Sequence, residues 1–264
     1  MVNMMSWKGV HFEEVHGVPV LGSEALQVTI REMIACHFQG FSINNRILSR
    51  YSQVLNDANR LLEPIAGVKF LLSHAVQALI ARIKEVLPAT WKILVPFQRT
   101  AARAYLVFCT IGPRLEEEVR RSSHEGEVAR AFIMDTVGSV AVAKYSKYIN
   151  LLISQEAAAR GWESGMPIMP GTRGIDLELQ RILFDIVDAK QIGLRVTKQN
   201  ILVPLKSLSM IIGVGPEVTI GSAGHDCKIC PKMNKCYLKE IWRMTEQSNE
   251  EMGLNDLIWH ERDN

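Results

Sequence analysis

The sequence has no excess of charge of either sign and no long apolar run. Its 30 lysine and arginine residues nearly balance 28 aspartate and glutamate residues, for a formal charge of +2. This balance gives no reason to expect a nucleic-acid partner or an anionic membrane surface. No uncharged apolar stretch reaches the roughly 18 residues that a membrane-spanning helix needs. The first residues do not resemble a secretion signal, so we expect a cytoplasmic protein without a membrane partner.

The common catalytic signatures are also missing. The sequence contains no Gly-x-Ser-x-Gly elbow, no phosphate-binding loop ending in Gly-Lys-Ser/Thr and no His-Glu-x-x-His zinc motif. These absences exclude the simplest assignments to serine hydrolases, nucleotide hydrolases and zinc proteases.

Apolar periodicity predicts long helices separated by short strands. Helical spacing runs through residues 44–62, 74–86 and 127–160, and again after Asp176. The runs 68–72, 105–110 and 210–213 have the composition of strands, and Ile192, Leu194 and Val196 alternate with polar residues and glycine as in a half-buried strand. We therefore expect an α+β domain over residues 1–222, in which helices cover a sheet. Residues 223–264 form a small cysteine-bearing appendage in this prediction.

Three of the five cysteines lie close together near the end of the chain. Cys227, Cys230 and Cys236 have the spacing C-x2-C-x5-C, and His225 stands two residues upstream. Two cysteines separated by two residues can place both sulfurs on one ion, and thiolates suit zinc or an iron–sulfur cluster. His225 is the nearest candidate for a fourth ligand. The alternatives are a structural zinc site, an iron–sulfur cluster, a redox-labile dithiol and cysteines without metal.

Three further blocks of sequence stand out. They read FCTIGPRLEEEVRR (Phe108–Arg121), FIMDTVGSVAV (Phe132–Val142) and PLKSLSMIIGVG (Pro204–Gly215), with Pro170-Gly171 and Gln180 preceding the last. Together they resemble the activation domain of cobalamin-dependent methionine synthase in its short stand-alone form. The resemblance implies a twisted antiparallel sheet with long helices packed around it.

The resemblance also implies a function. In that family the domain presents S-adenosylmethionine to a cobalamin whose cobalt has been oxidised, and one electron plus the equivalent of a methyl cation restores methylcobalamin. The sequence lacks Asp-x-His-x-x-Gly, by which corrinoid carriers give a histidine to cobalt. The corrinoid is therefore expected on a partner, either a corrinoid protein or a corrinoid methyltransferase. The alternative hypothesis is a non-catalytic corrinoid- or metal-binding module that has lost its S-adenosylmethionine site.

The resembling blocks supply the candidate cofactor-binding residues, which are Asp135, Ser139, Pro170, Gly171, Thr172, Arg173, Lys206 and Ser207. Each also has an ordinary structural interpretation. Asp135 and Ser139 are typical of a solvated helix face, Gly138 of close helix packing, and Lys206, Ser207 and Ser209 of an exposed lysine and turn serines before a strand.

The loop before the last block departs from the family pattern. Pro167 stands where the family has an arginine, and Thr172 stands where it has a tyrosine. Ala143 occupies a position where an acidic residue is expected. Losing a guanidinium that grips a carboxylate through two parallel hydrogen bonds predicts weak binding of S-adenosylmethionine.

Overall fold

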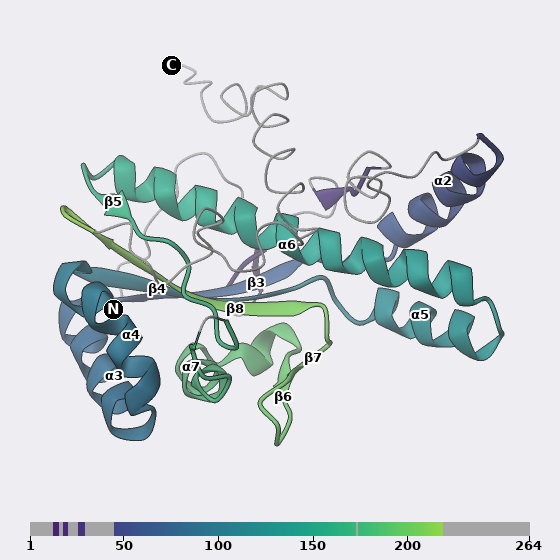
Figure 1. The fold of residues 1–264 in the computed structure, drawn as a ribbon. Coiled ribbons are helices and arrows are strands. Elements are labelled where there is room, and N and C mark those ends of the chain that lie inside the picture. The colour runs from purple at the N-terminus through teal and green to yellow at the C-terminus, as the bar shows by residue number, and fades with distance from the viewer. Residues whose placement is uncertain (1–12, 16–17, 21–25, 30–44, 173, 219–264) are drawn as a thin grey trace, which may run out of the picture.

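The computed structural model describes residues 13–15, 18–20, 26–29, 45–172 and 174–218, and Figure 1 shows their arrangement. The helices are α2 (Asn45–Asn59), α3 (Ser73–Val86), α4 (Pro88–Thr100), α5 (Arg114–His124), α6 (Val128–Ala158) and α7 (Leu179–Val187). The strands are β1 (Glu13–Val15), β2 (Val18–Val20), β3 (Ile65–Leu71), β4 (Arg103–Thr110), β5 (Glu163–Ser164), β6 (Arg195–Val196), β7 (Leu202–Val203) and β8 (Ser207–Gly215). This mixture of long helices and short strands confirms the α+β class.

The main sheet has four strands in the order β3-β4-β8-β5. All three pairings are antiparallel, and Val107 in the middle of β4 lies opposite Val68 on one side and Met210 on the other. An isolated antiparallel bridge between Ile168 and Ile211 continues the edge beyond β5. The predicted antiparallel sheet is therefore confirmed.

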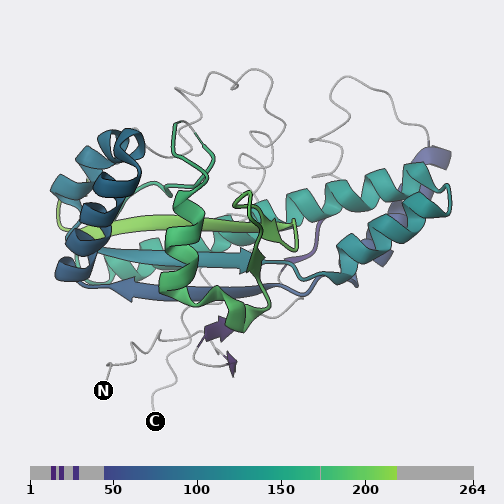
Figure 2. The ribbon, with the colours of Figure 1, turned by 90° about the horizontal axis from the view of Figure 1, so that it is seen from below.

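Helices cover both faces of this sheet. Side chains alternate along β4, so Tyr105, Val107 and Cys109 join the core with α2 and α6, whereas Leu106 and Phe108 join the core with α3, α4 and α7. Figures 1 and 2 show α6 on one side of the sheet and α3, α4 and α7 on the other. Both faces of β4 and β8 are therefore buried, which accounts for the long apolar runs in these strands. Each fully buried aliphatic side chain contributes about 1.5–3 kcal/mol to stability.

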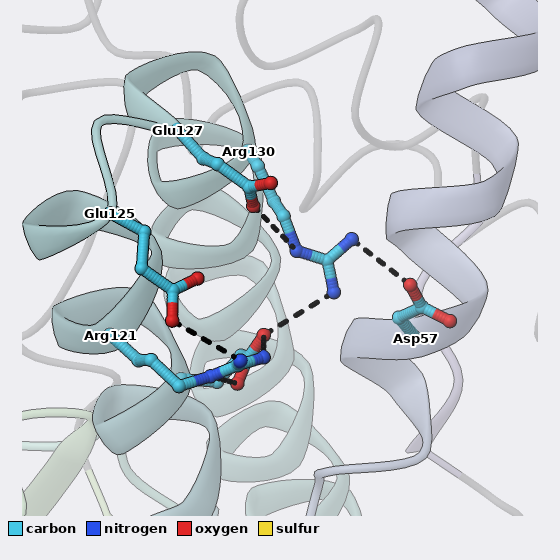
Figure 3. A network of polar contacts seen from close by, with 6 residues as sticks. Asp57, Arg121, Glu125, Glu127 and Arg130 are labelled. Atoms are coloured by element: carbon cyan, nitrogen blue, oxygen red, sulfur yellow. Dashed lines mark hydrogen bonds and ion pairs between the residues drawn. The ribbon is translucent and has the colours of Figure 1, made fainter.

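A salt-bridge network holds the helices at one end of the molecule together (Figure 3). Arg130 of α6 contacts Asp57 of α2 at 3.0 Å and Glu118 of α5 at 3.3 Å. Arg121 also contacts Glu118, at 2.7 Å. The hydrogen bond from Arg121, together with Arg130, holds the pKa of the Glu118 carboxyl below its usual range. One carboxylate thus joins two arginines and links α5 to α6.

Some sequence predictions need correction. The alternation at Ile192, Leu194 and Val196 predicts a strand, but Ile192 ends a 3-10 helix (Ala189–Ile192), and only Arg195–Val196 is extended. The backbone enters the left-handed region at Asp188 and again at Gly193, which turns the chain twice and leaves too few residues for a longer strand. Helix α4 is an element that the periodicity did not predict.

The last strand begins earlier than its apolar run predicts. Strand β8 starts at Ser207, so Ser207 and Ser209 belong to the strand instead of to a preceding turn. None of the described helices combines the length and apolar character needed to cross a bilayer.

Candidate functional site

The side chain of Lys206 joins two of the sequence blocks. Lys206 lies directly before β8, and its ammonium donates to a carboxylate oxygen of Asp135 at 2.7 Å and to the hydroxyl of Ser139 at 2.8 Å. Asp135 and Ser139 share one face of α6, as their spacing predicts. Only 17% of the Lys206 side chain is exposed, against 54% for Asp135. The interpretation of Lys206 as an ordinary surface lysine is therefore wrong.

Gly138 allows this lysine to approach the helix. A Cβ at Gly138 would lie 3.0 Å from Cδ2 of Leu115 and 3.1 Å from Cγ of Lys206. Real Cβ contacts are rarely that short, so a larger residue would push away either α5 or the lysine stem. The close-packing interpretation of Gly138 is confirmed, and the packing partner includes a candidate site residue.

The backbone of Lys206 contacts the first block, Phe108–Arg121. The N–H of Ile111 donates to the carbonyl of Lys206 at 3.2 Å, and the Thr110 hydroxyl lies 3.4 Å from the same oxygen. Gly112, which follows Ile111, has φ +79, and a Cβ on it would lie 2.7 Å from Cβ of Glu63. Glycine is required at this turn for both reasons. The Thr-Ile-Gly segment therefore fixes the backbone of Lys206.

The hydroxyl of Ser207 makes structural hydrogen bonds within the protein. Its hydroxyl oxygen lies 2.8 Å from the hydroxyl of Thr110 and 2.7 Å from the carbonyl of Pro204. The side chain is buried between β4 and β8. Ser207 therefore fixes the start of β8 and orients Lys206, and its oxygen is already satisfied by protein groups.

Glu116 is a residue that the sequence interpretation missed. It lies in the first turn of α5, and its carboxylate accepts the backbone N–H of Leu205 at 2.7 Å. This contact fixes the segment that carries Lys206 from a second side. The available signal was its place in the first resembling block, but glutamates are so common in charged helices that the position alone does not stand out.

A buried amide supports the same segment from the opposite face of the sheet. The carbonyl oxygen of Gln180 on α7 accepts the hydroxyl of Ser209 at 3.1 Å, and its amide nitrogen donates to the carbonyl of Asn200 at 2.5 Å. Gln180 and Ser209 are both buried. The signal in the sequence was a glutamine within the apolar stripe of a helix, where a polar group needs a partner.

The loop with Pro170, Gly171 and Thr172 forms a separate group. The Gly171 N–H donates to the carbonyl of Ile175 at 3.0 Å, and the Thr172 hydroxyl donates to the carbonyl of Met169 at 2.7 Å. These hydrogen bonds lead back into the loop and not to Asp135 or Lys206. Such amides have a partner already, so they do not form a ready-made anion site.

The end of the loop packs on α4. A Cβ at Gly174 would lie 2.8 Å from Cδ1 of Ile93, and the N–H of Asp176 donates to the hydroxyl of Thr90 at 2.9 Å. The carboxylate of Asp176 accepts the N–H of Glu178 at 2.8 Å, directly before α7. Arg173 lies outside the described residues.

Two of the three residues that depart from the family pattern, Pro167 and Ala143, are buried. Pro167, at the position of the family's arginine, is buried. Ala143, where an acidic residue is expected, is buried on α6. A carboxylate at residue 143 would be desolvated here, which gives a physical reason for alanine.

The proposed metal ligands Cys227, Cys230, Cys236 and His225 lie outside the described residues. Within the part of the chain that the structure describes, no group of three His, Cys, Asp or Glu side chains is arranged to hold a metal ion. Cys109 is described, and burial raises the pKa of its thiol to about 12. It therefore stays a protonated core thiol and is unsuited to supply a fourth thiolate.

Comparisons with known proteins show a similarity at the level of solved structures. No family model and no curated protein matches this chain. Among solved structures, the crystal structure of the MetH reactivation domain bound to AdoHcy is similar, with a TM-score of 0.46 and 10% sequence identity. The match covers 84% of this chain and 81% of that chain. At this identity, the chain's own residues must define its site.

Proposed function

We propose that this protein is an accessory or reactivation factor for corrinoid-dependent methyl transfer, acting on a corrinoid that a partner protein holds. The observation that carries the proposal is the convergence on Lys206. Its ammonium binds the block with Asp135 and Ser139, and its carbonyl accepts the N–H of Ile111 in the Thr-Ile-Gly block. Three blocks that resemble one family meet at one residue, although they are far apart in the chain.

The chemistry of this convergence suits a corrinoid. A corrin ring carries amide side chains, which both donate and accept hydrogen bonds. Lys206 supplies an ammonium and Asp135 a half-exposed carboxylate, so a donor and an acceptor lie side by side. Because Ser139, Ile111 and Gly138 fix the lysine, little side-chain entropy remains to be lost on binding.

The test of this proposal uses purified, cobalamin-loaded corrinoid proteins from the source organism. We expect sedimentation velocity under anaerobic conditions to show a complex with at least one of them. Lys206→Met keeps the stem over Gly138 but removes the ammonium, and we expect it to weaken the complex at least tenfold. Lys92→Met, at an exposed position of α4 on the opposite face of the sheet, is the matched control. Absence of any complex with the native protein would refute the function.

A second candidate is a corrinoid-binding module that no longer uses S-adenosylmethionine. The loop favours it, because a buried proline replaces the arginine and the hydroxyl of Thr172 is bonded to Met169. We expect titration calorimetry with S-adenosylmethionine to show weak or undetectable binding at micromolar protein. A tight one-to-one complex would contradict this candidate and would direct attention to Arg173 as the anchor.

A further inference from the structure

Arg103 lies at the end of the sheet opposite to the Lys206 pair. It is the first residue of β4, and its Cα partner on β8 is Val214. At the other end of β4, Thr110 is paired with Ser207, which directly follows Lys206. Figure 1 shows the Arg103 end of the sheet, where α6 leads into β5, on the side away from α5. This end of the molecule has its own polar chemistry.

Two aromatic rings hold the guanidinium of Arg103. Its Cζ lies 4.6 Å from the ring centroid of Trp162, between α6 and β5, and 5.8 Å from that of Phe70 on β3. The Phe70 ring in turn lies 4.8 Å from the ring of Tyr105. A ring attracts the cation through its π-electrons but takes up none of the strong in-plane donors of the guanidinium. The rings therefore position Arg103 and leave its N–H groups for another partner.

Arg103 has no acidic partner among the residues that the structure describes. No carboxylate of that part of the chain lies within ion-pair distance of its guanidinium, and Glu163 on the nearby β5 is exposed and makes no ion pair with it. Glu156 binds Arg160, through one oxygen that lies 2.5 Å from Nη2 and 3.0 Å from Nε. The carboxylate at this end of α6 is thus already used.

The Tyr105 hydroxyl does not supply the missing negative charge. Burial raises the pKa of Tyr105 to about 12, and the charge of Glu156 raises it further, against the opposing effects of Arg160 and Arg103. The phenol is therefore neutral near neutral pH. Two arginines and one carboxylate act on the same hydroxyl, which leaves an excess of one positive charge.

Other partly enclosed arginines of this protein do bind carboxylates. The side chain of Arg130 is 26% exposed and that of Arg160 is 33% exposed, and both form ion pairs. Arg103 is likewise half-buried. A cation that has lost part of its hydration is normally paired with an anion. The missing anion at Arg103 is the observation that indicates a ligand.

The charge and the neighbouring rings define the class of ligand. The guanidinium fork matches a carboxylate through two parallel hydrogen bonds, and the single negative charge of a carboxylate balances the excess at this site. A phosphate dianion would need a second free cation. Phe70 and Trp162 are only half-buried, so they leave apolar surface beside the guanidinium for the body of the ligand.

We propose that Arg103, with Phe70 and Trp162, binds the carboxylate of a small organic acid that has an apolar body. The site lies apart from Lys206 and does not depend on the proposed function. Its carboxylate ligand would lie at the end of the sheet where α6 leads into β5.

The test uses the full-length protein and benzoate as the probe. We expect saturation-transfer NMR to show binding of benzoate, and a titration to give its dissociation constant. Benzamide has the same shape without the charge, and inorganic phosphate has charge without the apolar body, so we expect both to bind at least about tenfold more weakly. No binding of benzoate, or equal binding of benzoate and benzamide, would overturn the proposal. Phosphate binding as tight as that of benzoate would overturn the assignment to a carboxylate.

Substitutions then locate the site. We expect Arg103→Gln to weaken benzoate binding at least about tenfold, and Arg103→Lys to fall between the two because it keeps the charge but loses the fork. Arg82→Gln is the matched control, since Arg82 is exposed on α3 at the opposite face of the sheet. It should bind benzoate as the native protein does. Urea denaturation verifies that each variant is folded, and a folded Arg103→Gln that binds benzoate like the native protein would refute the site.

Discussion

The ammonium of Lys206 lies 2.7 Å from the carboxylate of Asp135, across the junction between the start of β8 and the first half of α6. The lysine is mostly enclosed and the aspartate half exposed. Removing the ammonium leaves a carboxylate that water can solvate, so the loss of stability should be small, near that of an exposed pair at about 0–1 kcal/mol. A large loss of partner binding in Lys206→Met would therefore report on function and not on folding.

Gly138→Val tests the packing below that lysine. The new side chain meets Leu115 and the Lys206 stem, so we expect overpacking to lower the free energy of unfolding by about 1–3 kcal/mol. Urea denaturation measures it. Ala129→Val, at an exposed position of the same helix, should cost only about 0.6 kcal/mol through helix propensity. Equal costs at the two positions would contradict the close contact at Gly138.

Gln180→Leu tests the buried support from α7. The substitution leaves the hydroxyl of Ser209 and the carbonyl of Asn200 without their partner. We expect a loss of about 2 kcal/mol or more, since each unsatisfied buried group costs about 1–3 kcal/mol. Gln155→Leu, at an exposed position of α6, should change stability by less than about 0.5 kcal/mol. A neutral Gln180→Leu would show that the amide network does not support the strand.

The pH dependence of stability tests the network of Figure 3. The Arg121 guanidinium, with help from Arg130, lowers the pKa of Glu118. A carboxyl with a depressed folded-state pKa adds stability that is complete above its unfolded pKa of about 4.3 and is lost as the pH falls through the folded value. Glu118→Gln should therefore flatten the stability profile below about pH 4.3. Glu117→Gln, outside this network, is the control, and identical profiles for the two variants would contradict the assignment.

The cysteine cluster is tested by metal analysis of protein purified without oxygen. We expect a metal held by Cys227, Cys230 and Cys236. Iron with acid-labile sulfide would support electron delivery to cobalt, and stoichiometric zinc would support a structural role. Serine at any of the three positions should release the metal, whereas Cys109→Ala should retain it, because Cys109 is a buried core thiol. Metal-free native protein would refute the prediction.

The sequence predicted the elements whose signal is local. The apolar content of α6 and the composition of β4 are sufficient, because α6 carries buried residues from Ala131 to Ala157 and β4 is an almost fully buried strand. The strand expected at Ile192 failed because a left-handed residue at Asp188 starts a tight turn, and alternation alone does not report backbone direction.

The site was only partly predictable for the same reason. The spacing of Asp135 and Ser139 fixes their common face, but their contact with Lys206 depends on how β8 packs against α6. Glu116 and Thr110 act through a backbone N–H and a neighbouring hydroxyl. Such partners are set by tertiary structure, so no spacing in the sequence identifies them.

The most direct test of the central claim is an anaerobic absorbance spectrum of a cob(II)alamin-loaded corrinoid protein, recorded with and without this protein. We expect the native chain to shift the corrinoid bands at stoichiometric concentration, because in the proposed complex the Lys206 and Asp135 pair lies against the corrinoid. Lys206→Met should abolish the shift, and Lys92→Met should preserve it. Unchanged spectra with the native protein, across the corrinoid proteins of the source organism, would contradict the account.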